Sequence, residues 1–404
     1  MAHTVPSDLP LTRASVLAAH ELIKPHIHLT PVQTNTTLST LASTPQDPSA
    51  LIGTPWEGAT PAHPRISLFF KCENFQRIGA FKARGAFHAL TRLIERLGIE
   101  EMRRKGVVTH SSGNHAQALA LAARTFGVPA HIVMPSISTP SKIVGTQAQG
   151  AHVHFSGSTS EEREKVVESV VAQTGAVLVP PYDHEDIILG QGTMALEFTS
   201  QVEDILAQDK ARGVREGKVG LDAVIAPCGG GGMLSGNAIT LHGTGVRVFG
   251  AEPSFEGADD ARRGVAAGAR IPSVKTLTIA DGLRTPLSPL TYSVISDPTY
   301  VHGLYAVTEK NIRDAMRLVL ERMKCFVEPS AVVGLATVLY NEEFRRLVAR
   351  EGGEGWNIGV VFSGGNTTIE AITSIFADVD AKKAGRQEGT VGKDGAREVE
   401  NVAG

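Results

Sequence analysis

Lys82 stands in the segment FQRIGAFKARGAFHAL, residues 75–90, in a run of glycine, alanine and phenylalanine. Burying an unpaired ammonium is costly, so such a lysine extends to water, pairs with an anion, or has a lowered pKa and acts as an amine nucleophile. Extension to water is the commonest outcome for lysines in general. The chemistry of Lys82 therefore depends on which groups accompany it.

Four consecutive glycines, Gly229 to Gly232, lie between the apolar run DAVIAP and a helical pattern that opens near Met233. Successive backbone N–H groups in such a loop converge on an anion, and the helix N-terminus adds partial positive charge. A flexible connection is the ordinary alternative, but each glycine loses extra entropy on ordering, which argues against a run of four. The loop predicts a phosphate site.

A dinucleotide is one candidate for that phosphate, because Glu252 ends the next strand about 20 residues on, where a ribose-binding carboxylate would stand. The glycine spacing differs from the dinucleotide fingerprint, however. Leu234 and Ser235 occupy positions where glycine or alanine would allow close helix packing. The sequence therefore does not favour a nicotinamide cofactor.

Two further polar turns follow predicted strands, SSGNH at 111–115 and SGGN at 363–366. A helix cap needs one hydroxyl or amide side chain, whereas the first turn carries four polar side chains, so we expect it to contact a small carboxylate or a cofactor. The second turn offers Ser363 at a strand end. A phosphate loop, two polar turns and Lys82 together suit a phosphorylated carbonyl cofactor held as a Schiff base, with the lysine acting later as a base.

Short β-branched runs alternate mainly with helical patterns, as in Arg84–Leu97, where apolar residues recur at spacings of one, three and four. This alternation predicts an α/β fold with parallel sheets and ligands at the carboxyl ends of the strands. The predicted strands are 106–110, 130–134, 151–155, 176–180, 221–227, 246–252 and 357–363.

Composition limits the partners. A formal charge of −3, with 42% hydrophobic and 20% charged residues, is ordinary for a globular protein and gives no reason to expect nucleic acid or a membrane surface. The cysteines Cys72, Cys228 and Cys325 form no CxxC pair, and the N-terminus does not resemble a signal peptide, so we expect a reduced, cytoplasmic protein. Residues 41–65 and 381–404 are polar or rich in proline and glycine and read as surface loop or disorder.

Eight motifs occur in this order: FQRIGAFKARGA, SSGNH, GQGTMALE, GGGGML, ADDARR, IADGL, ERMKCFVEPSAVVGLA and SGGN. Together they resemble the serine racemase and serine/threonine dehydratase family of fold-type II pyridoxal-phosphate enzymes, over about Thr30 to Ile375. The resemblance implies a tryptophan synthase β-like fold with two domains, each with a mostly parallel twisted sheet flanked by helices. A large cofactor-binding domain would span 1–105 and 185–378 with a loop insertion at 41–65, a small mobile domain would span 106–184, and 379–404 would be a disordered polar tail.

The resemblance also implies residue roles. Lys82 would form the Schiff base and then act on the substrate Cα proton from one face, with Ser112 on the other face. Asn114 would bond the cofactor phenolic oxygen and Ser363 the pyridine nitrogen. Further cofactor-binding residues would be Phe81, Gly229, Gly230, Gly231, Gly232 and Met233, and the substrate side would include Ser111, Ser112, Asn114, His115, Arg163 and Thr285. Taken alone, Arg163 in EEREK is more typical of a solvated helix face.

The stretch GAEPSFEGADDARRG offers oxygen ligands for a divalent cation. An acidic surface turn fits its spacing equally well. The resemblance favours Mg²⁺, or Mn²⁺ or Ca²⁺, bound by the carboxylates of Glu252 and Asp260 and the carbonyl of Ala258. It also implies a homodimer with a small amino acid as substrate and neither nucleic acid nor membrane as partner.

We expect dehydration and deamination of serine, threonine or threo-3-hydroxyaspartate to an α-keto acid and ammonia, with possible serine racemisation. A racemase as the main activity, a pyridoxal-phosphate β-replacement synthase, and a non-catalytic phosphate- or nucleotide-binding module are the alternatives. Elimination and racemisation begin with removal of the same Cα proton, so the sequence does not set their ratio.

Overall fold

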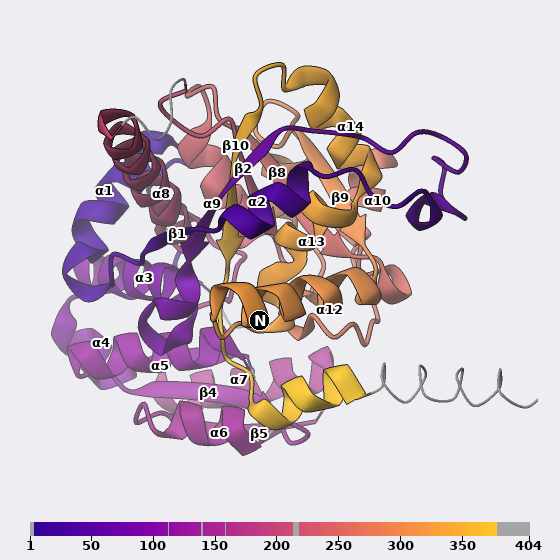
Figure 1. The fold of residues 1–404 in the computed structure, drawn as a ribbon. Helices are drawn as coiled ribbons and strands as arrows, with labels where there is room; N and C mark the ends of the chain where they lie inside the picture. The colour runs from indigo at the N-terminus through magenta and orange to yellow at the C-terminus, as the bar shows by residue number, and fades with distance from the viewer. Residues whose placement is uncertain (1–3, 112, 139, 158, 213–217, 378–404) are drawn as a thin grey trace, which may run out of the picture. The chain divides into compact units, whose positions relative to one another are not determined.

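The computed structural model describes residues 4–111, 113–138, 140–157, 159–212 and 218–377 (Figure 1). The described residues up to Asn366 form one compact unit with two β-sheets. Residues 369–377 are helical and belong to a second unit. The predicted polar tail, 379–404, lies outside the described residues.

The larger sheet has the strand order β1-β2-β10-β7-β8-β9. All of its neighbouring strands pair in parallel except β1, which runs antiparallel to β2. The strands are β1 (Val32–Thr34), β2 (Ile66–Cys72), β7 (Ala223–Pro227), β8 (Arg247–Pro253), β9 (Gly303–Val307) and β10 (Trp356–Phe362). Parallel pairing places the carboxyl ends of β2, β10, β7, β8 and β9 at one edge of the sheet.

The smaller sheet has the order β5-β4-β3-β6 and is parallel throughout. Its strands are β3 (Val107–His110), β4 (Ala130–Pro135), β5 (His152–Ser156) and β6 (Val177–Leu178). In Figure 1 this sheet and its helices lie below the larger sheet. All its strands fall within 106–184, although the division into a large and a small mobile domain stays a prediction.

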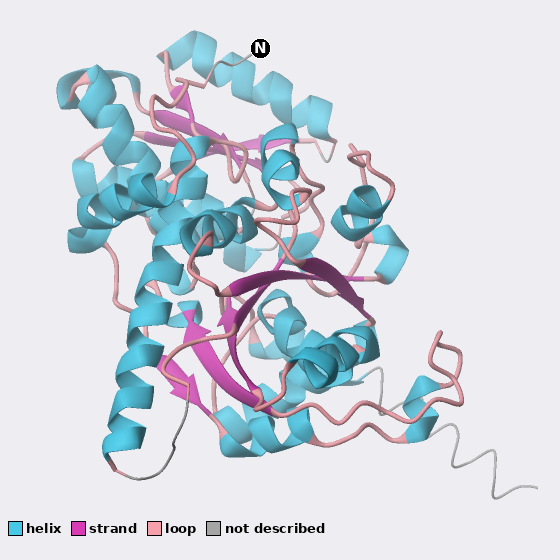
Figure 2. Cartoon of the chain, turned by 90° about the horizontal axis from the view of Figure 1, so that it is seen from above, coloured by secondary structure: helices cyan, strands magenta, loops and turns pink. Residues whose placement is uncertain are grey.

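Helices connect the strands and cover both sheets (Figure 2). They are α1 (Arg13–Ile23), α2 (Thr36–Ser43), α3 (Lys82–Leu97), α4 (Ile99–Lys105), α5 (Asn114–Phe126), α6 (Pro140–Gln147), α7 (Ser160–Thr174), α8 (Glu185–Ala211), α9 (Gly232–Leu241), α10 (Asp260–Ala266), α11 (Pro289–Ile295), α12 (Glu309–Leu318), α13 (Val333–Tyr340) and α14 (Glu342–Glu351).

Two adjacent residues of β10 show how the larger sheet is covered on both faces. A Cβ at Gly359 would lie 2.6 Å from the ring of Phe198 on α8. The side chain of Val360 points to α13 instead, where a Cβ at Gly334 would lie 3.6 Å from its Cγ1 atom. Neighbouring residues of a strand point to opposite faces, so α8 and α13 pack on opposite sides of the sheet. This two-sided burial accounts for the continuous apolar strand VVF in β10.

The α/β fold with mostly parallel sheets is confirmed, and each of the seven predicted strands is present. Strands β1, β2 and β9 were not predicted. The run ISLFFKC of β2 is buried almost throughout and therefore shows no alternation of polar and apolar residues. Helix α3 begins at Lys82, two residues before the predicted start at Arg84.

The insertion at 41–65 is mostly irregular, with a short 3₁₀ turn at Pro48–Leu51. Helix α14 holds it in place. The Glu342 carboxylate accepts a hydrogen bond from the Ala62 N–H at 2.8 Å, and Arg345 donates to the carbonyls of Ala42 and Thr44. The segment is therefore an ordered surface loop, one of the two outcomes that its composition predicted.

A buried ion network lies beside the start of α3. The fully buried guanidinium of Arg84 bonds Glu73 at 2.8 Å and Glu197 at 2.7 Å. Glu197 also pairs with the buried ammonium of Lys71 at 2.8 Å. Because charges inside a protein must be paired, this network fixes α3 against α8 and the end of β2.

We expect Arg84→Ala to lower the free energy of unfolding by about 3–5 kcal/mol, because it leaves two buried carboxylates without their shared partner. Arg104→Ala is the matched control, since Arg104 forms an exposed pair with Glu101 and should cost less than about 0.5 kcal/mol. Urea unfolding of both variants measures the difference. Equal losses would contradict a structural role for the buried network.

Candidate active site

One cavity of about 580 Å³ is lined by the ends of strands from both sheets. The groups around it include Lys82 at the start of α3, Ser111 after β3, the glycine loop after β7 and Ser363 after β10. These segments are far apart in the sequence. The structure thus brings together the predicted lysine, phosphate loop and polar turns.

Lys82 is half-buried, and its side chain lines the cavity. Burial lowers the pKa of its ammonium to about 8. The Nζ atom donates a hydrogen bond to the carbonyl of Pro181 at 2.6 Å and lies 5.2 Å from the ring centre of Phe81. A lysine amine that loses its proton near neutral pH can act as a nucleophile and as a base.

The glycine loop is packed too tightly for side chains. A Cβ at Gly230 would lie 2.6 Å from the ring of Tyr182, and Gly231 has a φ of 84°, which favours glycine. Within the described part of the chain, the N–H groups of Gly229, Gly230 and Gly231 have no hydrogen-bond acceptor. They stand before the N-terminus of α9, whose first turn also has free N–H groups, as a phosphate requires.

The turn before α5 places its polar residues at the same cavity. Ser111 accepts a hydrogen bond from the Gly113 N–H at 3.3 Å, and Asn114 is the first residue of the helix. His115 is buried, which lowers the pKa of its imidazole to about 3 and keeps it neutral. Ser112, the predicted second catalytic residue, lies outside the described residues.

A hydrogen-bonded group centred on Glu328 completes the site, although no motif of the sequence predicted a role for this residue. Its carboxylate accepts from Asn114 Nδ2 at 3.0 Å and from the Asn366 N–H at 3.1 Å, and Asn366 Nδ2 donates to Asn114 Oδ1 at 2.7 Å. Burial raises the pKa of Glu328 to about 7. The lone carboxyl in the apolar run CFVEPSAVVG was the signal that could have identified it.

The remaining predicted substrate residues, Arg163 and Thr285, also line the cavity. Lys142 on α6 pairs with Asp281 at 2.6 Å, and both residues line the cavity as well. Burial raises the pKa of Tyr182 to about 12, so its hydroxyl keeps its proton at neutral pH. Thus every predicted cofactor or substrate residue that the structure describes faces this one space.

The predicted cation ligands Glu252, Ala258 and Asp260 are buried and are not among the residues that line the cavity. The Glu252 carboxylate accepts from the N–H groups of Ala261 and Arg262 at 3.0 and 2.8 Å, so it caps the start of α10. Among the described residues, no group of three His, Cys, Asp or Glu side chains could hold a metal ion. The predicted ligand set has only two such side chains, Glu252 and Asp260, with the Ala258 carbonyl as its third ligand. It therefore stays a prediction.

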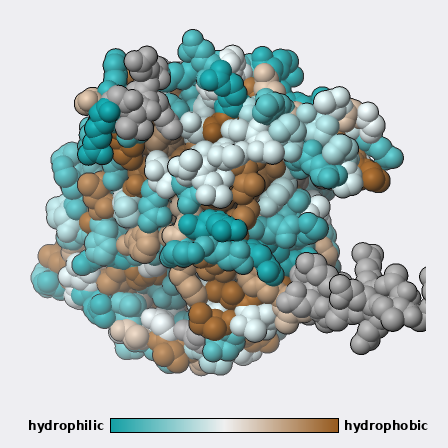
Figure 3. Space-filling model, in the orientation of Figure 1, coloured by the Kyte–Doolittle hydropathy of each residue, from teal (hydrophilic) through white to brown (hydrophobic). Residues whose placement is uncertain are grey.

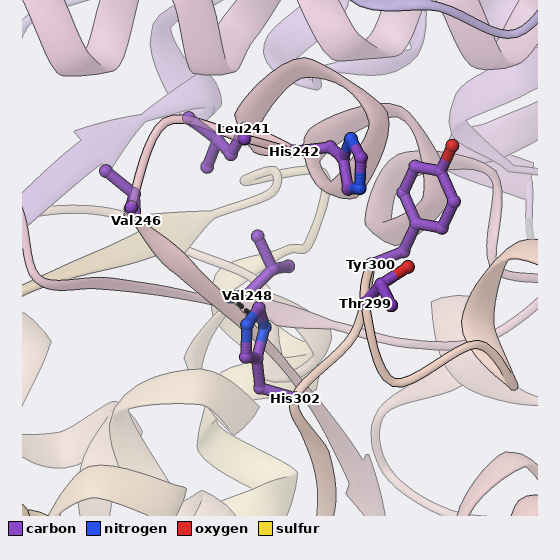
Figure 4. A pocket seen from close by; sticks show the side chains of 9 residues that line it. Leu241, His242, Val246, Val248, Thr299, Tyr300 and His302 are labelled. Carbon is purple, nitrogen blue, oxygen red and sulfur yellow. Dashed lines mark hydrogen bonds between the residues drawn. The ribbon is translucent and has the colours of Figure 1, made fainter.

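A second hollow, of about 90 Å³, lies beside the start of β8 and the segment that precedes β9 (Figure 4). His242 stacks on Tyr300 at its rim, and His302 Nδ1 accepts from the Val248 N–H at 3.2 Å. It is too small for a phosphorylated cofactor.

Polar residues cover most of the face drawn in Figure 3, interrupted by small apolar patches. No helix in the described ranges is long and apolar enough to cross a membrane.

The parallel sheets, the lysine amine at the cavity and the anion-binding glycine loop define an enzyme built to hold a phosphorylated carbonyl compound. Comparison with known proteins identifies the family: residues 53–364 match the model of the pyridoxal-phosphate dependent enzymes, and the chain belongs to that family. Pyridoxal phosphate fits the site, since the glycine loop can hold its phosphate and Lys82 can reach its aldehyde.

Several relatives are similar along most of their length. The chain is 38% identical to serine racemase of Arabidopsis thaliana, over 90% of this chain and 95% of the relative. It is 37% identical to the beta-hydroxyaspartate dehydratase of Paracoccus denitrificans, over 89% and 98%. The structure of maize serine racemase superposes with a TM-score of 0.73 at 36% identity, covering 92% of this chain and 99% of that one. These similarities confirm the fold-type II architecture.

We expect Glu328→Gln to remove a pH-dependent part of the stability of the cofactor-free protein. The pKa of this carboxyl is raised from 4.5 to about 7, so its contribution is fully present below about pH 4.5 and is lost as the pH rises to about 7. The free energy of unfolding of the variant relative to wild type should therefore rise by roughly 2–3 kcal/mol between pH 5 and pH 8.

Urea unfolding at the two pH values measures this change. The exposed Glu354→Gln is the control and should show almost none of it. A difference between the Glu328→Gln variant and wild type that does not depend on pH would show that Glu328 is ionised throughout this range.

Proposed function

We propose that this protein eliminates water from a small β-hydroxy amino acid. Hydrolysis of the dehydrated product then takes up one water and releases ammonia, leaving an α-keto acid. The main support is that the Lys82 amine, whose pKa is lowered to about 8, lines the same cavity as the glycine loop. Serine, threonine and threo-3-hydroxyaspartate are the candidate substrates. The similarity to a serine racemase and to a beta-hydroxyaspartate dehydratase supports this class of reaction.

The protein's own groups divide the work. Bound pyridoxal phosphate withdraws electrons from the substrate Cα, which makes its proton easier to remove. The N–H groups of Gly229–Gly232 and Met233 would hold the phosphate, Ser363 would donate its hydroxyl hydrogen to the pyridine nitrogen, and Asn114 would donate to the phenolic oxygen. The Lys82 amine would take the substrate Cα proton from one face.

The other groups at the cavity bind and orient the substrate. Neutral His115, Ser111 and Thr285 can donate or accept hydrogen bonds, and the Arg163 guanidinium suits the carboxylate of an amino acid. Lys82 can return a proton to the leaving hydroxyl, which completes the loss of water. Ser112 is proposed to act from the opposite face of the substrate.

Racemisation is the second candidate function, because the similarity to serine racemases extends over nine-tenths of the chain. If Ser112 returns a proton to Cα before the hydroxyl leaves, the product is the other enantiomer. A β-replacement synthase would instead require a thiol to capture the dehydrated product. A non-catalytic phosphate-binding module would have no use for an amine with a lowered pKa.

Lys82→Ala tests this function. We expect purified wild-type protein to show a visible absorbance band that borohydride abolishes, and the variant to be colourless with turnover lowered at least about a thousandfold. Keto acid and opposite enantiomer are measured together on serine, threonine and hydroxyaspartate isomers. Lys105→Ala is the control: Lys105 is half-buried, pairs with Glu101 and does not line the cavity, so this variant should keep wild-type colour and turnover. A wild-type protein that does not take up pyridoxal phosphate would overturn the proposal.

We further propose a divalent cation, Mg²⁺, Mn²⁺ or Ca²⁺, bound by Glu252, Asp260 and the Ala258 carbonyl. Both carboxylates are buried and each disfavours the other's charge, which a cation would relieve. A homodimer and a cytoplasmic location are further proposals, which rest on the resemblance and the composition.

Mg²⁺ added to metal-free protein should raise the melting temperature of wild type by about 3 °C or more, because the ion binds only the folded chain. Asp260→Asn should lose this shift. Asp259→Asn is the neighbouring control: Asp259 bonds Arg263 at 3.0 Å and should keep the shift. A wild-type melting temperature that is insensitive to all three ions would rule out the cation site.

A further inference from the structure

Two cysteines from distant parts of the chain lie near each other. Cys72 ends β2 and Cys325 follows the turn after α12, and both are almost completely buried, at 0% and 1% exposure. They lie close together: Asn74, two residues after Cys72, donates to Cys325 Sγ at 3.3 Å, and each thiol shifts the pKa of the other. Buried cysteines often serve only as small apolar side chains, so this proximity alone does not assign them a role.

The surroundings make the two sulfur atoms unequal. Asn74 Nδ2 donates to Cys325 Sγ at 3.3 Å, while Cys72 Sγ donates to the carbonyl of Phe70 at 3.4 Å. The nearby Cys72 thiol and the bond from Asn74 lower the pKa of Cys325 to about 7. The pKa of Cys72 is raised by the nearby Cys325 thiol and by burial. Cys325 is thus the sulfur that loses its proton more readily, and Cys72 the one that keeps it.

Cys325 is buried but lies just beneath the surface. The residues on either side of it, Lys324 and Phe326, are exposed. Lys324 also has a φ of 58°, a left-handed conformation that costs a non-glycine residue free energy and turns the chain inward at Cys325. A small oxidant such as hydrogen peroxide has only a short way to this sulfur, whereas Cys228, the third cysteine, is buried in a hydrophobic core cluster.

We propose that Cys72 and Cys325 form a reversible disulfide under peroxide and that this bond controls the geometry of the catalytic cavity. The Cys325 thiolate attacks one peroxide oxygen, the O–O bond breaks, and hydroxide leaves, giving a sulfenic acid. The Cys72 sulfur then attacks the Cys325 sulfur. The S–O bond breaks, the Cys72 proton goes to the departing oxygen as water, and the S–S bond forms.

Both cysteines are connected to groups of the cavity by short paths. Cys72 pairs in register with Phe362 of β10, the residue before Ser363. Phe326, which follows Cys325, accepts from Asn74 Nδ2 at 3.2 Å, and two residues later the Glu328 N–H donates to Gly364 at 3.1 Å. Drawing the two sulfur atoms to bonding distance therefore shifts the segments that carry Ser363 and Glu328.

The test uses the full-length protein loaded with pyridoxal phosphate. After peroxide treatment, mass spectrometry of a non-reduced digest should find the Cys72 and Cys325 peptides joined, with the loss of two hydrogen atoms, and dithiothreitol should separate them. Turnover should fall at least about fivefold on oxidation and recover on reduction, because small displacements in an active site are costly. Cys72→Ser and Cys325→Ser should each resist this inactivation.

The outcomes separate this proposal from the catalytic one. Unjoined peptides, or a sulfenic or sulfinic acid alone on Cys325, would overturn the disulfide whether or not the protein is a dehydratase. Joined peptides with unchanged turnover would overturn the control of the cavity. If neither serine variant folds, peptide mapping of wild type still decides the first point, and thiol-reversible loss of the visible cofactor band decides the second.

Discussion

The guanidinium of Arg84 is the interaction on which the site depends. It is fully buried, and its bonds to Glu73 and Glu197 join α3, the end of β2 and α8. Any shift of one element would leave a charge unpaired at low dielectric, which is more costly than most packing defects. Lys82 lies two residues earlier on α3, so the same pairing sets where its amine stands. The ion network contributes mainly by fixing position, since apolar residues could fill this volume at similar stability.

Burial shifts the pKa values of several groups around the cavity towards their neutral forms. It lowers the pKa of Lys82 to about 8 and that of His115 to about 3, and it raises that of Glu328 to about 7. In each case the neutral form is favoured. Arg163 and the Lys142–Asp281 pair also line the cavity, and the free N–H groups of the glycine loop add backbone dipoles that attract a phosphate.

The sequence allowed the α/β class, seven strands, Lys82 and the glycine loop to be predicted, because β-branched runs and glycine turns are local signals. What it did not reveal depends on contacts between distant residues. Strand β2 has no alternation because both of its faces are buried. Glu328 reaches Asn114 across 214 residues, and only the folded sheet edge brings them together. Helix α3 begins at Lys82, two residues before the predicted start, because Phe81, the residue before it, already has helical backbone angles.

The bonds between Asn114, Glu328 and Asn366 connect the helix after β3 with the loops of the larger sheet. Asn114 Oδ1 accepts from Asn366, and one hydrogen of its Nδ2 goes to Glu328. An amide nitrogen has two hydrogens, so the second is free to donate into the cavity. An ionised Glu328 can only accept, which holds the amide in this orientation. The carboxylate therefore supports the proposed bond from Asn114 to the cofactor, and its protonation would remove one reason for the amide to keep that orientation.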